Sequence, residues 1–275
     1  MASHTTTLRA TAVVCTALIG AAPIALAPAA HATSSPPVSV RAPSPTPDPF
    51  KGLTADQIAE KAVTATQSAH SLRMTGRVSS GGQPLDVDFS VSDKSECTGA
   101  IKLQGGVAEL RRTGGVTYMK GDEAFWRASM TSQGMPPAQI DATIELLKGR
   151  WLKISEGQPG AEDLGSVCDL KSLLADLGKN KEQRTGLVRG PDSKVKGTPV
   201  ATLVKRQTSG ETTTTTTTIV SVSERGKPYI LKMVKTGGTD PGSVVLSDYD
   251  KPVKVVTPPA DETVDLTKLD QGTPA

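Results

Sequence analysis

The chain has 275 residues, enough for one large domain or two small ones, and its 26 glycines and 20 prolines favour short strands joined by turns. Aromatic residues make up only 3% of it, and 31 basic and 28 acidic residues, interspersed along the chain, leave a formal charge of +3. Because the chain has neither a basic face nor aromatic stacking platforms, nucleic-acid binding is excluded, and its three histidines and three cysteines offer few metal ligands.

The N-terminus is typical of an export signal. Arg9 precedes an apolar run at residues 10–27, and residues 30–32 (AHA) form an A-x-A cleavage site. We therefore expect residues 1–32 to be a signal peptide that is cleaved near Ala32, which makes the mature protein extracellular or associated with the cell envelope. A retained membrane anchor is the alternative, and it is disfavoured because glycine and proline interrupt the apolar run.

The residues that follow predict a linker and then one folded domain. Cys15 lies after valine, where a lipoprotein signal needs a small residue, so we expect no lipid anchor there. Residues 33–50 hold six prolines and four serines and predict a disordered linker, either a spacer from a surface or an unstructured remnant. The folded domain is expected over residues 51–275.

The first half of this domain predicts a helix followed by a strand meander. Thr54 is a suitable N-cap for an amphipathic helix that ends near Ser68. From residue 71 the apolar positions alternate, and the glycines near residue 81 predict a hairpin of strands 71–78 and 85–91. Further strands are predicted at 97–104, 107–113 and 116–120, with glycine pairs between them.

The second half predicts helices and then a second meander. Helices are expected at 135–148 and 164–177, with a short strand at 151–154 between them. Strands are then expected at 182–189, 199–206, 212–223, 228–235 and 243–250. Segregated strands and helices predict an α+β fold in which a strongly curved, unclosed antiparallel sheet wraps over helices. Two domains divided at 155–180 are the alternative, although the connection there is short.

Motifs that could support catalysis have simpler explanations. The mature chain holds a single histidine, His70, at a helix-to-strand boundary, and no nucleophile elbow accompanies it. Ser193 and Lys235 lie in fragments that resemble penicillin-binding enzymes, but the third motif of that group is missing. Asp86 and Asp88 share the polar face of a strand, which is typical of a solvated surface. We therefore expect no enzyme and no cofactor.

Cys97 and Cys168 are the only cysteines after the expected signal peptide. A pair of cysteines in an exported protein usually forms a disulfide, and the spacing here is not that of a redox motif. The sequence therefore predicts a structural disulfide between them.

Several short motifs resemble the actinobacterial LppX/LprG-type envelope lipoproteins. They are CTGAI at 97–101, VTYMKGD at 116–122, FW at 125–126, WLKI at 151–154, VCDL at 167–170, LSDYDKPV at 246–253 and PP at 258–259. The resemblance covers residues 53–269 and implies a fold similar to that of the carrier LolA, a half-barrel with an apolar cavity for acyl chains. Members of that group usually carry a lipobox cysteine, which this chain lacks.

The sequence and the resemblance together indicate an exported, non-enzymatic carrier or sensor for a lipid or glycolipid, which binds in a cavity between the curved sheet and the helices. An envelope transporter or a cell-wall component is the expected partner. The alternative is an interaction module with the same fold and a filled core, which binds a protein or a cell-wall polymer. The scarcity of aromatic residues favours an unfilled cavity. We expect its lining to be the apolar face of the strands: Leu85, Val87, Phe89, Ile101, Leu103, Leu231 and Met233.

Overall fold

The computed structural model describes residues 47–80, 82–158, 161–179, 185–209, 214–238 and 240–265. These residues belong to one compact unit that begins at Pro47. The predicted signal peptide at residues 1–32 and most of the linker at 33–50 lie outside them, as does part of the strand predicted at 182–189. Within the described ranges, no helix combines the length and the apolar character needed to cross a bilayer.

The first part of this unit is a helix, a strand meander and a helical pair. In chain order the elements are α1 (Ala55–Gln67), β1 (Ser71–Ser80), β2 (Gln83–Ser92), β3 (Cys97–Leu103), β4 (Gly106–Thr113), β5 (Val116–Gly121), α2 (Glu123–Ser132), α3 (Pro137–Leu147) and β6 (Trp151–Ile154). The helix, the hairpin and the meander predicted from the sequence are thereby confirmed.

The second part contains two more helices and the second meander. Its elements are α4 (Ala161–Val167), α5 (Leu170–Lys179), β7 (Val188–Arg189), β8 (Ser193–Val195), β9 (Thr198–Ser209), β10 (Thr214–Ser223), β11 (Ile230–Thr236), β12 (Gly242–Ser247), η2 (Ala260–Glu262) and β13 (Thr263–Asp265).

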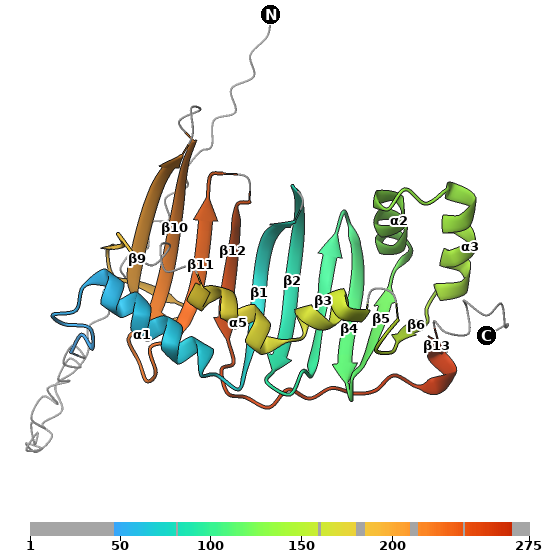
Figure 1. Cartoon of the computed structure of the whole chain (residues 1–275), viewed down its shortest axis with the longest axis horizontal. Helices are drawn as coiled ribbons and strands as arrows, with labels where there is room; N and C mark the ends of the chain where they lie inside the picture. The colour runs from blue at the N-terminus through green and yellow to red at the C-terminus, as the bar shows by residue number, and fades with distance from the viewer. Residues whose placement is uncertain are drawn as a thin grey trace, which may run out of the picture. The chain divides into compact units, whose positions relative to one another are not determined.

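All these strands form one sheet with the order β13-β6-β5-β4-β3-β2-β1-β12-β11-β10-β9-β7, and β8 pairs with β9. The two meanders join where β1 and β12 run antiparallel, with Met74 opposite Leu246. Figure 1 shows α1 and α5 crossing one face of the sheet near the lower ends of the strands, and α2 and α3 at the β5 end. The predicted fold class, an unclosed sheet wrapped over helices, is confirmed.

Helix α1 shows how the sequence builds this arrangement. Thr54 and Gln57 form a capping box, in which each side chain accepts a hydrogen bond from the other's backbone N–H. The apolar face of the helix then buries Ile58 and Ala62 completely against the sheet. Because burial of such a face supplies most of a helix's stability, α1 is fixed in place across the strands.

Several elements differ from the predictions, and the short strands β8 and β13 were not expected. Helix α2 was not expected, although Asp122 caps it by accepting a hydrogen bond from the Phe125 N–H at 2.7 Å. The single helix predicted at 164–177 is two helices, α4 and α5, separated at Cys168 and Asp169. Of the strand predicted at 182–189, only β7 is a strand among the described residues.

Glycines allow α2 to lie directly on the sheet. A Cβ on Gly106 would come within 2.1 Å of the Phe125 backbone nitrogen, and one on Gly121 would come within 2.7 Å of the Phe125 ring. Both contacts are closer than real Cβ atoms make, so these positions need glycine. The β5 end of the face is therefore closed by α2.

After β12, the chain returns across the sheet as a strap, residues 248–262. Figure 1 shows it following the lower ends of the strands as far as β13. The Arg111 guanidinium of β4 donates to the carbonyl of Val256 at 3.1 Å, and β13 then pairs with β6 in parallel. The strap thus connects the middle of the sheet to its far edge.

Candidate functional site

The strand register divides the helix-bearing face of the sheet into transverse rows. The rows beneath the helices are packed: apart from the partly buried Met74, their apolar side chains are at most 9% exposed. They include Leu72, Phe89, Val91, Leu110, Met119, Leu152 and Leu246. This part of the face is a hydrophobic core, so the cavity expected between the sheet and the helices does not lie here.

The rows farther from the helices hold apolar side chains that are only half-buried. We call this set the apolar track, and it consists of Val78, Leu85, Val87, Ile101, Leu103, Val220, Met233 and Val244. Figure 1 shows no helix in front of the upper parts of β9–β12, β1 and β2. In the described part of the chain, the track is therefore an apolar surface between α2 at one end and β9 at the other.

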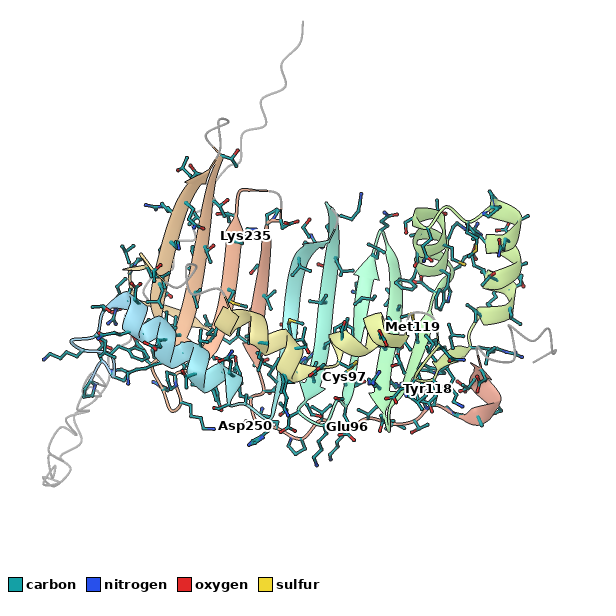
Figure 2. The ribbon with its side chains drawn as sticks, in the orientation of Figure 1. Glu96, Cys97, Tyr118, Met119, Lys235 and Asp250 are labelled. Atoms are coloured by element: carbon teal, nitrogen blue, oxygen red, sulfur yellow. A yellow bond between two sulfur atoms is a disulfide. The ribbon has the colours of Figure 1, made fainter. Side chains whose placement is uncertain are left out.

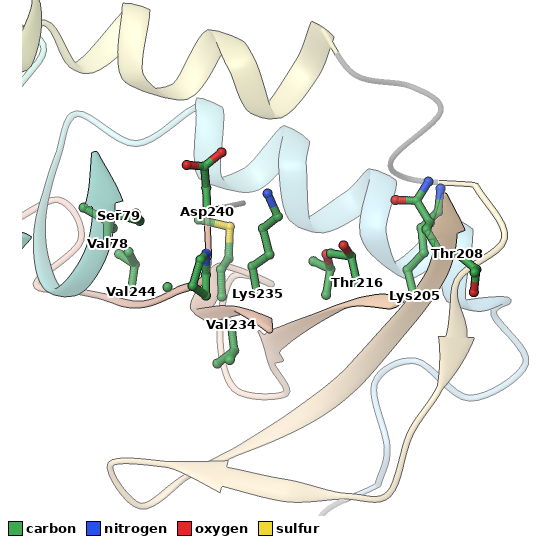
Figure 3. A pocket seen from close by; sticks show the side chains of 14 residues that line it. Val78, Ser79, Lys205, Thr208, Thr216, Val234, Lys235, Asp240 and Val244 are labelled. Atoms are coloured by element: carbon green, nitrogen blue, oxygen red, sulfur yellow. The ribbon is translucent and has the colours of Figure 1, made fainter. Parts of the chain in front are cut away.

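A groove of about 650 Å³ lies over the β9 end of this track. That volume falls within the range of small-ligand sites, about 300–1,000 Å³. The groove is lined by Val78, Ser79, Lys205, Gln207, Thr208, Thr216, Thr218, Met233, Val234, Lys235, Asp240, Pro241, Gly242 and Val244. In Figure 3, Lys235, Thr216 and Asp240 extend from the same side of the ribbon, opposite to Val234. The groove thus combines an apolar floor with polar and charged side chains.

Two lysines in this groove lie on the same face of the sheet, on β9 and β11 with β10 between them, because of the sheet register. Thr218 of β10 pairs with Lys205 of β9 on one side and with Lys235 of β11 on the other. Side chains opposite one another across neighbouring strands share a face of the sheet. Figure 2 places Lys235 in the upper part of the sheet, well away from the helix-covered Cys97.

The structure separates the seven residues that the sequence proposed as a cavity lining. Leu85, Val87, Ile101, Leu103 and Met233 all belong to the apolar track, and Met233 also lines the groove. Phe89 is 2% exposed and packs in the core instead.

Leu231 lies at a β-bulge and departs from the simple alternation. Beyond the pair of Ser221 with Lys232, Val222 pairs with Ile230, so the neighbouring Leu231 has no partner across β10. The buried side chain at this end of β11 is that of Ile230, which is 2% exposed. A bulge adds one residue to a strand and shifts its alternation, so counting by twos from Met233 misplaces the inward residue.

Asp86 and Asp88 lie on the opposite face and are ion-paired. Arg77 holds Asp86 at 2.6 Å and Arg73 holds Asp88 at 2.7 Å. The hydrogen bond from each arginine lowers the pKa of its carboxyl partner. A general acid for glycoside cleavage needs a raised pKa, which neither carboxyl has. These two pairs are ion pairs on the outer surface of the sheet.

The other residues considered for chemistry are also accounted for by local contacts. The His70 ring, with 78% of its side chain exposed, contacts Asp93 at 2.7 Å. The Ser193 hydroxyl is 2.9 Å from that of Thr202. Among the described residues, no three His, Cys, Asp or Glu side chains gather as a metal site would require.

The predicted disulfide between Cys97 and Cys168 is confirmed. Both residues are completely buried, and their Cα atoms are 5.3 Å apart. Cys97 begins β3, and Cys168 lies between α4 and α5. The bond therefore attaches the helical cover to the sheet beside the packed core.

Comparison with solved structures places this architecture among known folds. The structure of LprF from Mycobacterium bovis superimposes with a TM-score of 0.50 and 15% identity, covering 74% of this chain and 96% of LprF. The chain has the LprF fold. The Mycobacterium tuberculosis lipoprotein LppX also matches, with a TM-score of 0.45 and 13% identity over 74% of this chain and 98% of LppX. The match to LprF supports the resemblance to LppX/LprG-type proteins at the level of the fold. No family model and no curated protein matches the sequence.

Sequence reasoning missed the polar part of the groove. Lys205 and Lys235 are 30 positions apart in strands that were predicted only approximately. Their closeness in space depends on the register of β9 with β10 and on that of β10 with β11. The one available signal was that each lysine follows an inward apolar residue by two positions: Lys205 follows Leu203, and Lys235 follows Met233. Residues two apart in a strand share a face of the sheet.

Proposed function

We propose that this protein is an exported, non-enzymatic carrier or sensor that binds the acyl part of a lipid or glycolipid along the apolar track. The observation that supports the proposal is the half-burial of the whole track beside a fully packed core. The apolar part of the sheet beneath α1 and α5 is already filled, whereas no helix among the described residues lies in front of the part of the track on β10–β12, β1 and β2.

The physical argument rests on what apolar surface costs in water. Each exposed Å² of apolar surface costs about 25 cal/mol, and large contiguous apolar patches usually mark interaction sites. An acyl chain is narrow and flexible, so it fits a shallow track without the precise pockets that aromatic side chains need. The few aromatic residues of the chain leave the track uncrowded.

Lipid extraction tests the proposal most directly. We expect native mass spectrometry of the mature protein, purified without detergent, to show an adduct that organic extraction removes and identifies as a lipid. The extracted protein should then take up a fluorescent fatty-acyl probe with a saturable affinity. A protein that carries no extractable lipid and binds no acyl probe would contradict the carrier and favour the interaction module.

The packed rows under the helices are what that interaction module would require. Phe89 and Val91 fill the covered part of the face, so a ligand cannot enter there without displacing the helices. If the track binds no lipid, it becomes a surface for a protein or a cell-wall polymer, with an envelope transporter as one such partner. Pull-down with mature protein after lipid extraction distinguishes the two uses.

A further inference from the structure

One transverse row of the sheet joins the two lysines to the apolar track. From Lys205 and Thr218 the row passes to Lys235, which pairs with Gly242. It continues beyond Gly242, whose neighbour is Val78, to the paired Leu85 and Leu103. The row is cationic at one end and apolar at the other.

The spacing within this row suits one anionic group. At the usual distance between neighbouring strands of about 4.8 Å, the Cα atoms of Lys205 and Lys235 are about 10 Å apart. Both side chains are long enough to converge above Thr218, whose hydroxyl is a further donor. Gly242 has no side chain, so nothing rises from the row between Lys235 and Val78.

The charges that line the groove favour an anion. Asp240 is the only acid among the described lining residues, against Lys205 and Lys235. In a partly apolar groove, a pair of cations stabilises a phosphate or carboxylate more than it does at an open surface.

We propose that the ligand is an anionic lipid, whose charged head group lies between Lys205 and Lys235 and whose acyl chain follows the apolar track towards β3. This inference rests on the proposed function and adds the head-group class. At the usual strand spacing, the row from β9 to β3 is about 29 Å long, enough for an extended acyl chain. An acidic peptide is disfavoured, because the backbones of β10 and β11 are already paired on both sides and offer no edge to an added strand.

Two probes that differ only in head-group charge test the inference. We expect the extracted protein to bind a fluorescent-acyl phosphatidylglycerol more tightly than the diacylglycerol with the same acyl chains. The preference for the anionic probe should shrink as salt is raised, because screening weakens contacts between charges. Glycerophosphate, the head group without acyl chains, should compete poorly.

Variants assign the preference to the lysines. The double change Lys205→Met and Lys235→Met should weaken phosphatidylglycerol binding by about tenfold to hundredfold and diacylglycerol binding by less than about twofold. Lys232→Met is the matched control, because Lys232 lies on the other face of β11 opposite Ser221. It removes the same charge and should leave both affinities unchanged.

The outcomes separate this inference from the proposed function. A parent protein that binds neither probe contradicts both. A parent that binds the two probes equally, or a double variant that loses both equally, overturns the head-group assignment while leaving the carrier function intact. Competition by glycerophosphate as strong as by the intact lipid would overturn the role of the track.

Discussion

The hydroxyl oxygen of Thr66, in α1, accepts a hydrogen bond from the backbone N–H of Ile230 at the start of β11, at 3.0 Å. Thr66 is completely buried and Ile230 is 2% exposed, and 164 residues separate them in sequence. A helix from the beginning of the domain thus provides the hydrogen-bond partner that a strand of the second meander needs at its bulge. Buried backbone groups without a partner are costly, so this bond couples the two halves of the sheet.

Replacing Thr66 with valine should remove this coupling. The change keeps the shape of the side chain and leaves the Ile230 N–H buried without an acceptor, so we expect the free energy of unfolding to fall by about 1–3 kcal/mol. Urea denaturation followed by circular dichroism measures this. Thr64→Val, at an exposed position of the same helix, should change stability by less than about 0.5 kcal/mol. Equal effects of the two changes would refute the coupling.

Removal of the disulfide should destabilise the protein without unfolding its core completely. We expect the double change Cys97→Ala and Cys168→Ala to lower the free energy of unfolding by about 2–5 kcal/mol, because the unfolded chain loses a covalent restraint across 71 residues. Adding a reductant to the parent should reproduce most of this loss, and adding it to the double variant should have no effect. A parent protein insensitive to reductant under denaturing conditions would contradict the bond.

Two positions of β2 distinguish the track from the packed core. Val87 lies in the track and is half-buried, whereas Val91 is completely buried on the same face of the strand. Val87→Trp should fill the track, abolish uptake of an acyl probe and change stability by less than about 1 kcal/mol. Val91→Trp should overpack the core and cost about 1–3 kcal/mol or more.

Leu103→Trp extends the comparison to the next strand of the track and should behave like Val87→Trp. Thermal unfolding and probe titration of all three variants are the measurements. If Val87→Trp and Leu103→Trp lower the melting temperature as much as Val91→Trp does, then the track is part of the core and binds no lipid.

We expect Asp250 to make the stability of the folded protein depend on pH in the acid range. Hydrogen bonds from the Tyr229 hydroxyl at 2.6 Å and from the His70 backbone N–H at 2.9 Å, together with Lys227, lower its pKa from 3.8 to about 2. Because the folded pKa is depressed, the stabilisation is complete above pH 4 and is lost as the pH falls towards 2. Asp250→Asn should therefore be less stable than the parent at pH 6, and the difference should shrink at pH 2.

Chemical denaturation at a series of pH values measures the effect of Asp250. The exposed Asp261 supplies the control, since its replacement by asparagine should change stability at pH 6 by less than about 0.5 kcal/mol. A stability difference between parent and Asp250→Asn that stays constant from pH 6 to pH 2 would show that these hydrogen bonds do not favour the ionised carboxylate.

The strands could be predicted from sequence because their signal is local. In β2 the alternation of Leu85, Val87 and Phe89 with Asp86 and Asp88 fixes which side chains share a face, and the structure confirms that alternation. Local signals also existed for two features that were missed. Asp122 caps α2, and Asp169 caps α5 by accepting hydrogen bonds from the N–H groups of Lys171 and Ser172.

The depth of each residue could not be predicted, because it depends on distant parts of the chain. Phe89 and Val87 look equivalent in the sequence, yet Phe89 is fully packed in the core, whereas among the described residues the row that contains Val87 meets a helix only at its β5 end, where α2 lies on Gly121. The bulge that leaves Leu231 without a partner lies between β10 and β11, and no glycine marks its position in the sequence. Lys205 and Lys235 likewise come close together only because of the registers of β9 with β10 and of β10 with β11. The pattern of a single sequence does not determine these registers.

The strap also has a consequence for the order in which the molecule is made. The ribosome produces β6 early, but its outer edge stays open until β13, more than 100 residues later, arrives to pair with it. The inner edge at β1 waits in the same way for β12. A half-finished chain therefore carries a β1–β6 meander with two unpaired edges, the kind of surface on which nascent chains stick to one another. Both edges of this half of the sheet are therefore completed only when β12 and β13 are available to pair.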